Sequence, residues 1–184
     1  MAATPSTMPP LGMTAPAFTL PDARGRTHSL EDFSGSKGLL VAFICPHCPF
    51  VVHIRKEFGA FARVYRERGL AVVAIVSNNL DQSPQDGPEG MLREAEGGGY
   101  DFPYLLDESQ DVAKAYGAVC TPDFFGFDRD LKLRYRGRLD AGVREEPPPG
   151  APRELVEAMR KIAAGEAPEE QVPSIGCSIK WRAA

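Results

Sequence analysis

Continuous apolar runs and helically spaced apolar positions alternate along the chain. Two runs, at residues 38–44 and 70–77, contain no charged residue and stop at a cysteine or an asparagine. Such runs are typical of strands that are buried on both faces of a sheet. Between them, apolar side chains recur every three or four residues, which predicts an amphipathic helix from about residue 50 to Arg68-Gly69. The pattern therefore begins with a strand, a helix and a second strand.

Shorter elements follow in the second half of the chain. A polar loop, "NNLDQSPQDGPEG", leads into a short helix that begins at Pro88 and stops at the glycines 97–99. The remaining predicted elements are a strand in 102–107, a helix in 110–117, a hairpin of strands 123–128 and 131–137, and a helix in 153–164. Two short strands are expected upstream, near 17–20 and 27–30. Helices that alternate with buried strands indicate an α/β sheet with helices on both faces.

The chain has 184 residues, which fits one domain with a full hydrophobic core. We expect residues 1–13 to be a flexible, proline-rich lead and residues 14–165 to form the domain. Residues 166–184 lack a helical pattern and are expected to be a C-terminal tail that packs on the domain.

Charge and composition exclude several classes of function. The net charge is −4 and the basic residues are scattered, which argues against binding to nucleic acid or to a membrane surface. No apolar segment reaches the ~18–20 residues that span a bilayer. The N-terminus lacks the features of a signal peptide, so we expect a cytoplasmic location, where thiols are mostly reduced. Four cysteines in that setting indicate redox or metal chemistry.

Cys45 and Cys48 enclose the tetrapeptide "CPHC" between the first buried strand and the long helix. A helix N-terminus lowers the pKa of a thiol, and the thiolate is the nucleophile in disulfide exchange. A second cysteine within reach can close a disulfide, which makes the two-electron chemistry reversible. A zinc site would need another Cys/His pair at matching spacing, whereas the other candidates are scattered along the chain. We therefore predict a redox pair, with no metal and no bound cofactor.

Two segments resemble a known superfamily. The segment "APAFTLPDARGRTHSLEDFSGSKG" with the following "LLVAFICPHCP" is similar to thioredoxin-like proteins, above all to the peroxiredoxin-like (AhpC/TSA, redoxin) branch. The segment "YGAVCTP" resembles the part of these proteins that carries a cis-proline. The resemblance covers about residues 14–165 and implies a thioredoxin-like fold with a central mixed sheet and extra N-terminal strands. It also implies that Thr121-Pro122 is cis, lies against the active cysteine and offers backbone groups to an extended substrate.

Pro49 bears on which cysteine attacks. Proline is favoured at the first helical position and disfavours helical geometry at the residue before it, so the helix should begin at Pro49 with Cys48 as its N-cap. We therefore hypothesise that Cys48 is the attacking thiol and that Cys45 resolves the mixed disulfide. The reverse assignment, with Cys45 exposed and attacking, stays open. His47 either tunes the two thiols or is an exposed turn residue.

The chain departs from the peroxiredoxin pattern PxxxTxxC. Counted back from Cys48, Cys45 stands at the threonine position and Val41 at the proline position. We therefore expect exchange with disulfide-bearing protein or small-thiol substrates, followed by regeneration by a thiol reductant. A peroxiredoxin-like thiol peroxidase is the alternative. A metal-handling module like the Sco-type copper chaperones fits less well, because those carry CxxxC and a distal histidine.

Cys120 and Cys177 allow two interpretations. Cys120 lies two residues before Pro122, and Cys177 lies in the tail after Gly176, which permits a turn. They could form a second disulfide or redox pair that fixes the tail across the site. They could equally be two unpaired thiols, one buried and one in a surface tail.

Overall fold

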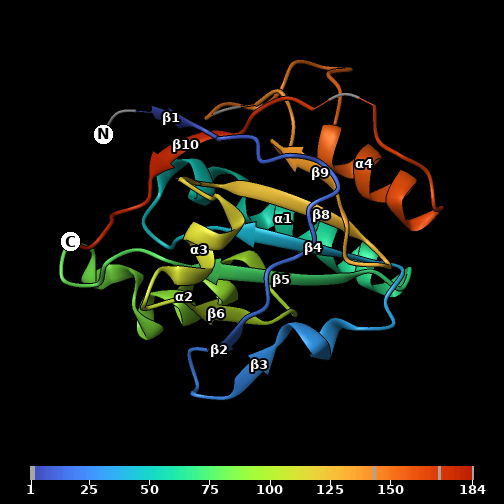
Figure 1. Ribbon diagram of the computed structural model, residues 1–184. Helices are drawn as coiled ribbons and strands as arrows, with labels where there is room; N and C mark the ends of the chain where they lie inside the picture. Colours follow the sequence, from blue (N-terminus) through green and yellow to red (C-terminus); the bar gives the residue numbers. More distant parts are fainter. Residues whose placement is uncertain (1–2, 143, 170, 184) are drawn as a thin grey trace.

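The computed structural model describes residues 3–142, 144–169 and 171–183. Its centre is a five-stranded sheet with the strand order β6-β5-β4-β8-β9 (Figure 1). The strands are β4 (Gly38–Phe43), β5 (Ala71–Val76), β6 (Tyr104–Leu106), β8 (Asp123–Asp128) and β9 (Leu133–Gly137). The pairs β4–β5 and β5–β6 are parallel, while β4–β8 and β8–β9 are antiparallel. The sheet is therefore mixed, as expected.

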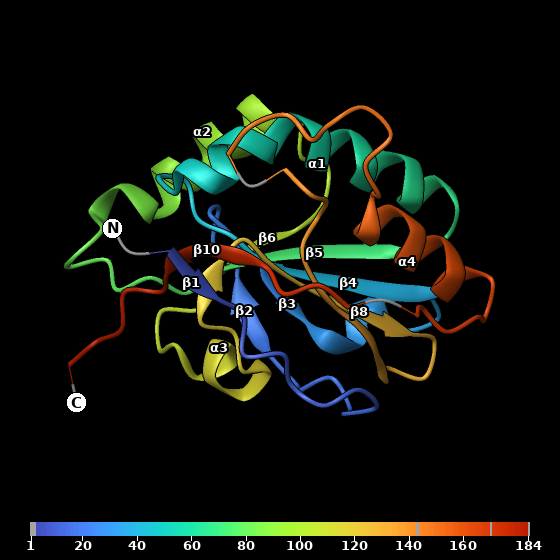
Figure 2. The same ribbon diagram turned by 90° about the horizontal axis from the view of Figure 1, so that it is seen from above.

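Helices cover both faces of this sheet (Figure 2). One face carries α1 (Pro49–Glu67), α2 (Pro88–Gly98) and α4 (Glu154–Ala163). The other carries α3 (Asp111–Tyr116), the ribbon of β2 (Thr19–Pro21) and β3 (Thr27–Ser29), and the 3-10 turn η1 (Leu30–Phe33). None of the helices in the described ranges is both long and apolar enough to cross a membrane.

Strand β4 shows why its sequence is apolar throughout. Leu40 and Ala42 pack in the core beneath α1, whereas Leu39, Val41 and Phe43 pack in the core on the opposite face. Side chains of a strand alternate between the two faces, so a strand covered on both sides needs an apolar residue at every position. All five of these side chains are fully buried. The predicted strand–helix–strand unit is thus confirmed.

The two ends of the chain meet in a second, small sheet. It has the order β1-β10-β7, with β1 (Ala3–Pro5), β10 (Ile175–Ser178) and β7 (Cys120–Thr121). The prediction of a flexible lead was therefore wrong for residues 3–5, which pair with β10. Such short strands carry no periodic signal of their own, because the partner that satisfies their backbone groups is distant in sequence. The predicted domain boundaries, at residues 13/14 and 165/166, stay predictions.

The polar loop after β5 is not an exposed loop throughout. It contains the 3-10 turn η2 (Pro84–Asp86), and Asn78, Asn79 and Asp86 are buried within it. A loop with buried polar side chains needs hydrogen-bond partners for them. Asp86 finds its partners in Asn78 and in His47, which lies after β4 between the two cysteines.

Candidate active site

Cys45 and Cys48 lie in the connection between β4 and α1, and both are fully buried. Cys48 is the N-cap of α1 and Pro49 is the first helical residue, as predicted. The carbonyl oxygen of Cys48 accepts hydrogen bonds from the N–H groups of Val51 and Val52, each at 2.9 Å. The sulfur of Cys48 therefore lies at the positive end of the helix dipole.

Thr121 of β7 contacts both sulfurs from the other side. The sulfur of Cys48 lies 3.1 Å from the carbonyl oxygen of Thr121, to which it donates a hydrogen bond when it is protonated. The sulfur of Cys45 lies 3.3 Å from the Thr121 hydroxyl oxygen. The peptide bond between Thr121 and Pro122 is cis. The fold thus brings together Cys45, Cys48 and the Thr121-Pro122 pair, which are far apart in the sequence.

The two thiols differ in acidity. A hydrogen bond from the Cys45 side chain, helped by Thr121 and by the backbone of Val51 and Cys177, lowers the pKa of Cys48 to about 5 against the opposing effect of burial. The same hydrogen bond, burial and the negative charge of Asp86 raise the pKa of Cys45 well above its ordinary value. At neutral pH the pair therefore holds a thiolate at Cys48 and a thiol at Cys45.

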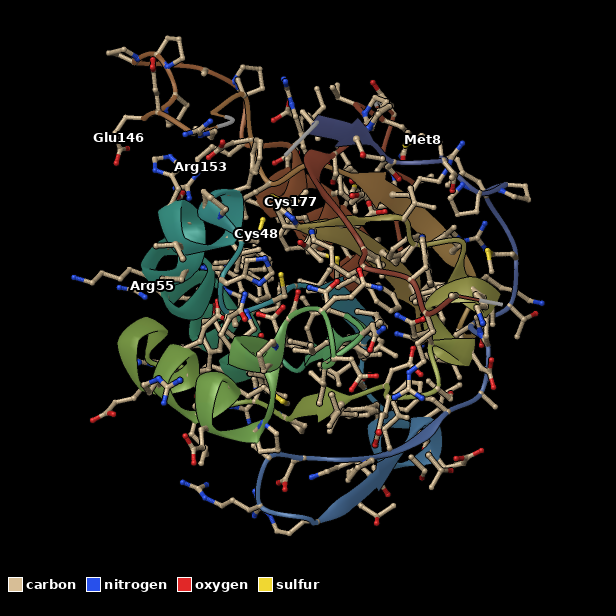
Figure 3. The ribbon with its side chains drawn as sticks, turned by 90° about the vertical axis from the view of Figure 1, so that its left-hand side faces the viewer. Met8, Cys48, Arg55, Glu146, Arg153 and Cys177 are labelled. Atoms are coloured by element: carbon tan, nitrogen blue, oxygen red, sulfur yellow. The ribbon has the colours of Figure 1, made fainter. Side chains whose placement is uncertain are left out.

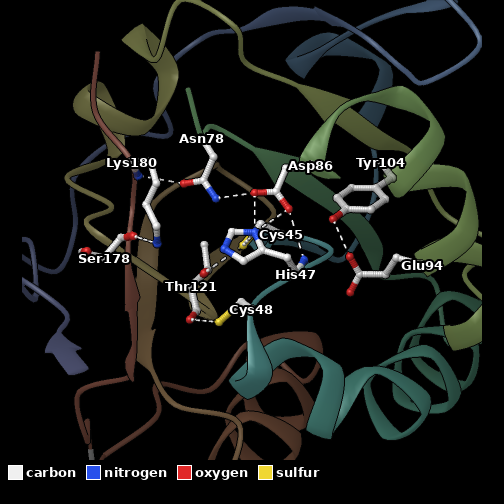
Figure 4. A network of polar contacts seen from close by, with 10 residues as sticks. All are labelled: Cys45, His47, Cys48, Asn78, Asp86, Glu94, Tyr104, Thr121, Ser178 and Lys180. Atoms are coloured by element: carbon white, nitrogen blue, oxygen red, sulfur yellow. Dashed lines mark hydrogen bonds and ion pairs between the residues drawn. The ribbon is translucent and has the colours of Figure 1, made fainter. Parts of the chain in front are cut away.

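A polar network fixes His47 beside these sulfurs (Figure 4). The carboxylate of Asp86 accepts hydrogen bonds from His47 Nδ1 at 2.6 Å and from the His47 backbone N–H at 3.1 Å. Asn78 donates to the same carboxylate at 2.8 Å. His47 Nδ1 is also 4.0 Å from the sulfur of Cys45. His47 is thus half-buried and held in one orientation, rather than free in an exposed turn.

Asp86 and Asn78 are the site residues that sequence reasoning missed. Both belong to a loop whose composition predicts exposure, and no spacing links them to the cysteines. Their burial next to a half-buried histidine is visible only in the folded chain. A search for charged residues in loops that follow the buried strands could have raised Asp86 as a candidate.

Three potential metal ligands converge at the same point. The sulfur of Cys45, a ring nitrogen of His47 and a carboxylate oxygen of Asp86 all lie within 4.8 Å of one another. A thiolate, an imidazole and a carboxylate are ligands that suit zinc, so these residues could hold an ion. The same atoms already satisfy one another through the hydrogen bonds between His47 and Asp86.

The other two cysteines take different positions from those considered in the sequence. All four cysteines are free thiols. In the pairing of β10 with β7, Cys177 is opposite Thr121 and Ser178 is opposite Cys120. Because neighbouring residues of a strand point to opposite faces, Cys177 and Cys120 project from opposite faces of this small sheet. The register therefore disfavours a Cys120–Cys177 disulfide.

Cys177 instead contacts the CPHC pair. It packs in the same buried cluster as Cys48, where its backbone helps to lower the pKa of Cys48 and Cys48 helps to raise the pKa of Cys177. Cys120 is buried away from it, with its sulfur 3.8 Å from the carbonyl oxygen of Pro122, and burial raises its pKa. Gly176, which would permit a turn, lies within the strand β10.

An apolar pocket of about 220 Å³ lies next to the cis-proline. Phe50 and Ile54 from the first turns of α1 line it, together with Pro122 and with Ile175 of β10. Arg138 and Asp140 add charged groups to its lining. The pocket thus adjoins both the helix that begins after Cys48 and the strand that carries Cys177.

A buried carboxyl lies directly after the cis-proline. Asp123 is fully buried, and the hydroxyl of Ser6 donates to it at 3.0 Å. Burial raises the pKa of Asp123 to about 8. This carboxyl is therefore largely protonated at neutral pH.

Relatives of known sequence support the resemblance. The chain matches the family model described as Redoxin over residues 10–149. It is 30% identical to the thiol-disulfide oxidoreductase ResA of Geobacillus thermodenitrificans over 67% of each chain. It is 32% identical to a candidate peroxiredoxin of Mycobacterium tuberculosis over 62% of this chain and 68% of that one.

Solved structures support the fold. An uncharacterized conserved protein from Geobacillus kaustophilus matches with a TM-score of 0.94 and 47% identity over 100% of this chain and 98% of that one. A hypothetical protein from Sinorhizobium meliloti 1021 matches with a TM-score of 0.91 and 46% identity over 98% of this chain and 100% of that one. The predicted thioredoxin-like fold is confirmed, and since the family model spans most of the chain, the protein belongs to the Redoxin family of thiol-based oxidoreductases.

Proposed function

We propose that the protein exchanges disulfides with protein or small-thiol substrates, with Cys48 as the attacking thiol and Cys45 as the resolving thiol. The observation that carries the proposal is the place of Cys48 as the N-cap of α1, with Cys45 and Thr121 beside it, where the pKa of Cys48 is lowered to about 5. The thiolate is the reactive form, and a buried neighbour that stays protonated cannot compete for the first attack.

The reaction takes two exchange steps. The Cys48 thiolate attacks one sulfur of a substrate disulfide, a mixed disulfide forms, and the released thiolate takes up a proton. Cys45 then loses its proton and attacks the sulfur of Cys48, which releases the second substrate thiol. The protein is left with a Cys45–Cys48 disulfide and has transferred two electrons to the substrate, and an external thiol reductant restores it.

The electrostatics favour this order of steps. The negative charge of Cys48 is one of the causes that raise the pKa of Cys45. That charge disappears when Cys48 enters the mixed disulfide, so Cys45 becomes more acidic when it is needed as a nucleophile. Thr121 and His47 provide the polar groups within reach of its sulfur.

We propose that the substrate disulfide approaches beside Thr121 and Pro122. The apolar pocket next to Pro122 could receive an apolar group near the substrate disulfide, with Phe50 and Ile175 in its walls. Part of the backbone of β7 is already paired with β10, so an extended protein substrate would have less of this edge to bind. A cytoplasmic location remains part of the proposal.

The test is the first exchange step in reduced variants. Reaction with a chromogenic aromatic disulfide, such as dithiobis(nitrobenzoate), releases a coloured thiolate when the mixed disulfide forms. Cys48→Ser should abolish the fast release, while Cys45→Ser should retain it. A fast phase that survives the loss of Cys48 but not the loss of Cys45 would reverse the assignment.

A thiol peroxidase is the second candidate, favoured by the similarity to a candidate peroxiredoxin of Mycobacterium tuberculosis. Against it, the position of the peroxide-binding threonine is occupied by Cys45, whose thiol contacts Cys48. Hydrogen peroxide with a sulfenic-acid probe distinguishes the two functions. Rapid labelling of Cys48 in Cys45→Ser supports a peroxidase, and Cys48 that stays reduced in millimolar peroxide excludes it.

A further inference from the structure

Cys177 has no role in the exchange described above, yet it lies at the same sulfur. It belongs to β10, close to the C-terminal end of the chain, and only 2% of its surface is exposed. Figure 3 shows Cys177 and Cys48 next to each other at the start of α1. A tail cysteine at the reactive thiol of the protein is not explained by packing alone.

The register of β10 sets this contact. Cys177 is opposite Thr121, the residue that contacts both Cys45 and Cys48. Cys177 and Cys48 pack in the same buried cluster, where the backbone of Cys177 helps to lower the pKa of Cys48. Cys48 therefore has two thiol neighbours, one from its own loop and one from the tail.

Gly176 allows β10 to come this close. A Cβ atom at this position would lie 1.9 Å from the carbonyl oxygen of Thr121, which no real contact permits. Only glycine therefore fits where the two backbones meet. The glycine holds the neighbouring Cys177 in register with Thr121.

We propose that Cys177 is a second resolving thiol, which closes a disulfide with Cys48 in competition with Cys45. The proposal rests on the proposed exchange function, with Cys48 as the attacking thiol. In the step, Cys177 gives its proton to solvent, and its sulfur attacks Cys48 in the mixed disulfide. A Cys48–Cys177 bond forms, the bond to the substrate sulfur breaks, and the released thiolate takes up a proton.

The surroundings of the two resolving thiols differ. Asp86 adds negative charge beside Cys45 and opposes its ionisation. Burial raises the pKa of Cys177 to about 11, while the positive charge of Lys180 opposes this rise. Both thiols stay protonated while Cys48 carries its charge, and both become more acidic when Cys48 enters the mixed disulfide.

The resulting disulfide would join the tail to the helix. Cys48 caps α1, and Cys177 lies next to residues of β10 that line the apolar pocket. Cys45 could then attack the sulfur of Cys48, which forms the Cys45–Cys48 disulfide and releases Cys177 as a thiolate. The site thus exchanges one internal disulfide for another with no net change of electrons.

The experiment compares two double variants with the same number of thiols. Reduced Cys45→Ser/Cys120→Ser and Cys45→Ser/Cys177→Ser each receive one equivalent of dithiobis(nitrobenzoate). Both should release the first coloured thiolate at the same rate, which shows that Cys48 reacts equally in the two variants. The variant that keeps Cys177 should release a second coloured thiolate rapidly, and peptide mapping should find a Cys48–Cys177 disulfide in it. Because intramolecular attack is strongly favoured, the second release should be roughly 100-fold slower without Cys177.

One result would overturn the proposal. This is that the mixed disulfide at Cys48 lives as long in Cys45→Ser/Cys120→Ser, which keeps Cys177, as in Cys45→Ser/Cys177→Ser, which lacks it. The proposed function can fail separately. If Cys48→Ser still forms a mixed disulfide at Cys45, the assignment of the attacking thiol is wrong. If wild type forms Cys45–Cys48 and the second release never depends on Cys177, only the further proposal falls.

Discussion

The acidity of Cys48 should depend on the thiol of Cys45. The pKa of Cys48 falls from 9.0 to about 5, and the hydrogen bond from Cys45 is the largest cause of the fall. A shift of this size corresponds to ~5 kcal/mol in favour of the thiolate. A hydrogen bond to a charged group contributes about 1.5–3 kcal/mol, or ~1–2 pKa units. Cys45→Ala should therefore raise the pKa of Cys48 to about 6–7.

Thiolate absorbance in the ultraviolet, followed against pH in reduced protein, measures this change. At about pH 5.5 the thiolate fraction of Cys48 should fall from about three quarters to about a tenth in Cys45→Ala. Cys45→Ser should show a smaller shift, because its hydroxyl can donate in the same direction. Cys120→Ser is the matched control, because the sulfur of Cys120 bonds to the carbonyl oxygen of Pro122 and not to Cys48. The pKa of Cys48 should be unchanged in this variant.

Two results would refute this reasoning. An unchanged pKa of Cys48 in Cys45→Ala would mean that the helix terminus and the backbone N–H groups alone stabilise the thiolate. A low-pKa transition that remains in Cys48→Ser and disappears in Cys45→Ala would mean that Cys45 carries the thiolate. The second result would also reverse the roles in the proposed reaction.

Three further predictions concern neighbouring residues. Asp86→Asn removes a negative charge that raises the pKa of Cys45, so the attack of Cys45 on the mixed disulfide should become faster near neutral pH. An unchanged dependence of this rate on pH would contradict the prediction. Asp123 has a raised pKa of about 8, so the unfolded state releases its proton first and stability should fall as the pH rises from about 4 to about 8. Asp123→Asn should flatten that fall and raise the Tm at pH 9 by more than about 3 °C, with no gain at pH 4. Gly176→Ala forces β10 away from Thr121, at a cost of about 1–3 kcal/mol in denaturant unfolding, and should slow formation of the Cys48–Cys177 disulfide in Cys45→Ser. A variant that forms this disulfide at the unchanged rate would show that Gly176 does not set the contact.

Several features of the protein could be predicted because their cause is local. The apolar run that became β4 and the helical spacing that became α1 follow from which faces must be buried. The start of α1 at Pro49, with Cys48 as its N-cap, follows from the geometry of a single residue. These features place a cysteine at a helix terminus without any knowledge of the rest of the fold.

The neighbours of that cysteine could not be predicted in the same way. Asp86 lies in a polar loop, and only the packing of that loop against the end of β4 buries it beside His47. The pairing of β1 with β10 depends on backbone partners from opposite ends of the chain. No periodic pattern in a strand this short indicates its partner.

The amino-acid sequence by itself determined the α/β class, the close spacing of Cys45 and Cys48 and the position of Cys48 at the start of a helix. Each of these depends on residues within a few positions of one another. Only the tertiary structure decided that Cys177, rather than Cys120, lies at the sulfur of Cys48. The register of β10 against β7 sets this choice, and a shift of one residue would point the other face of the strand at the site.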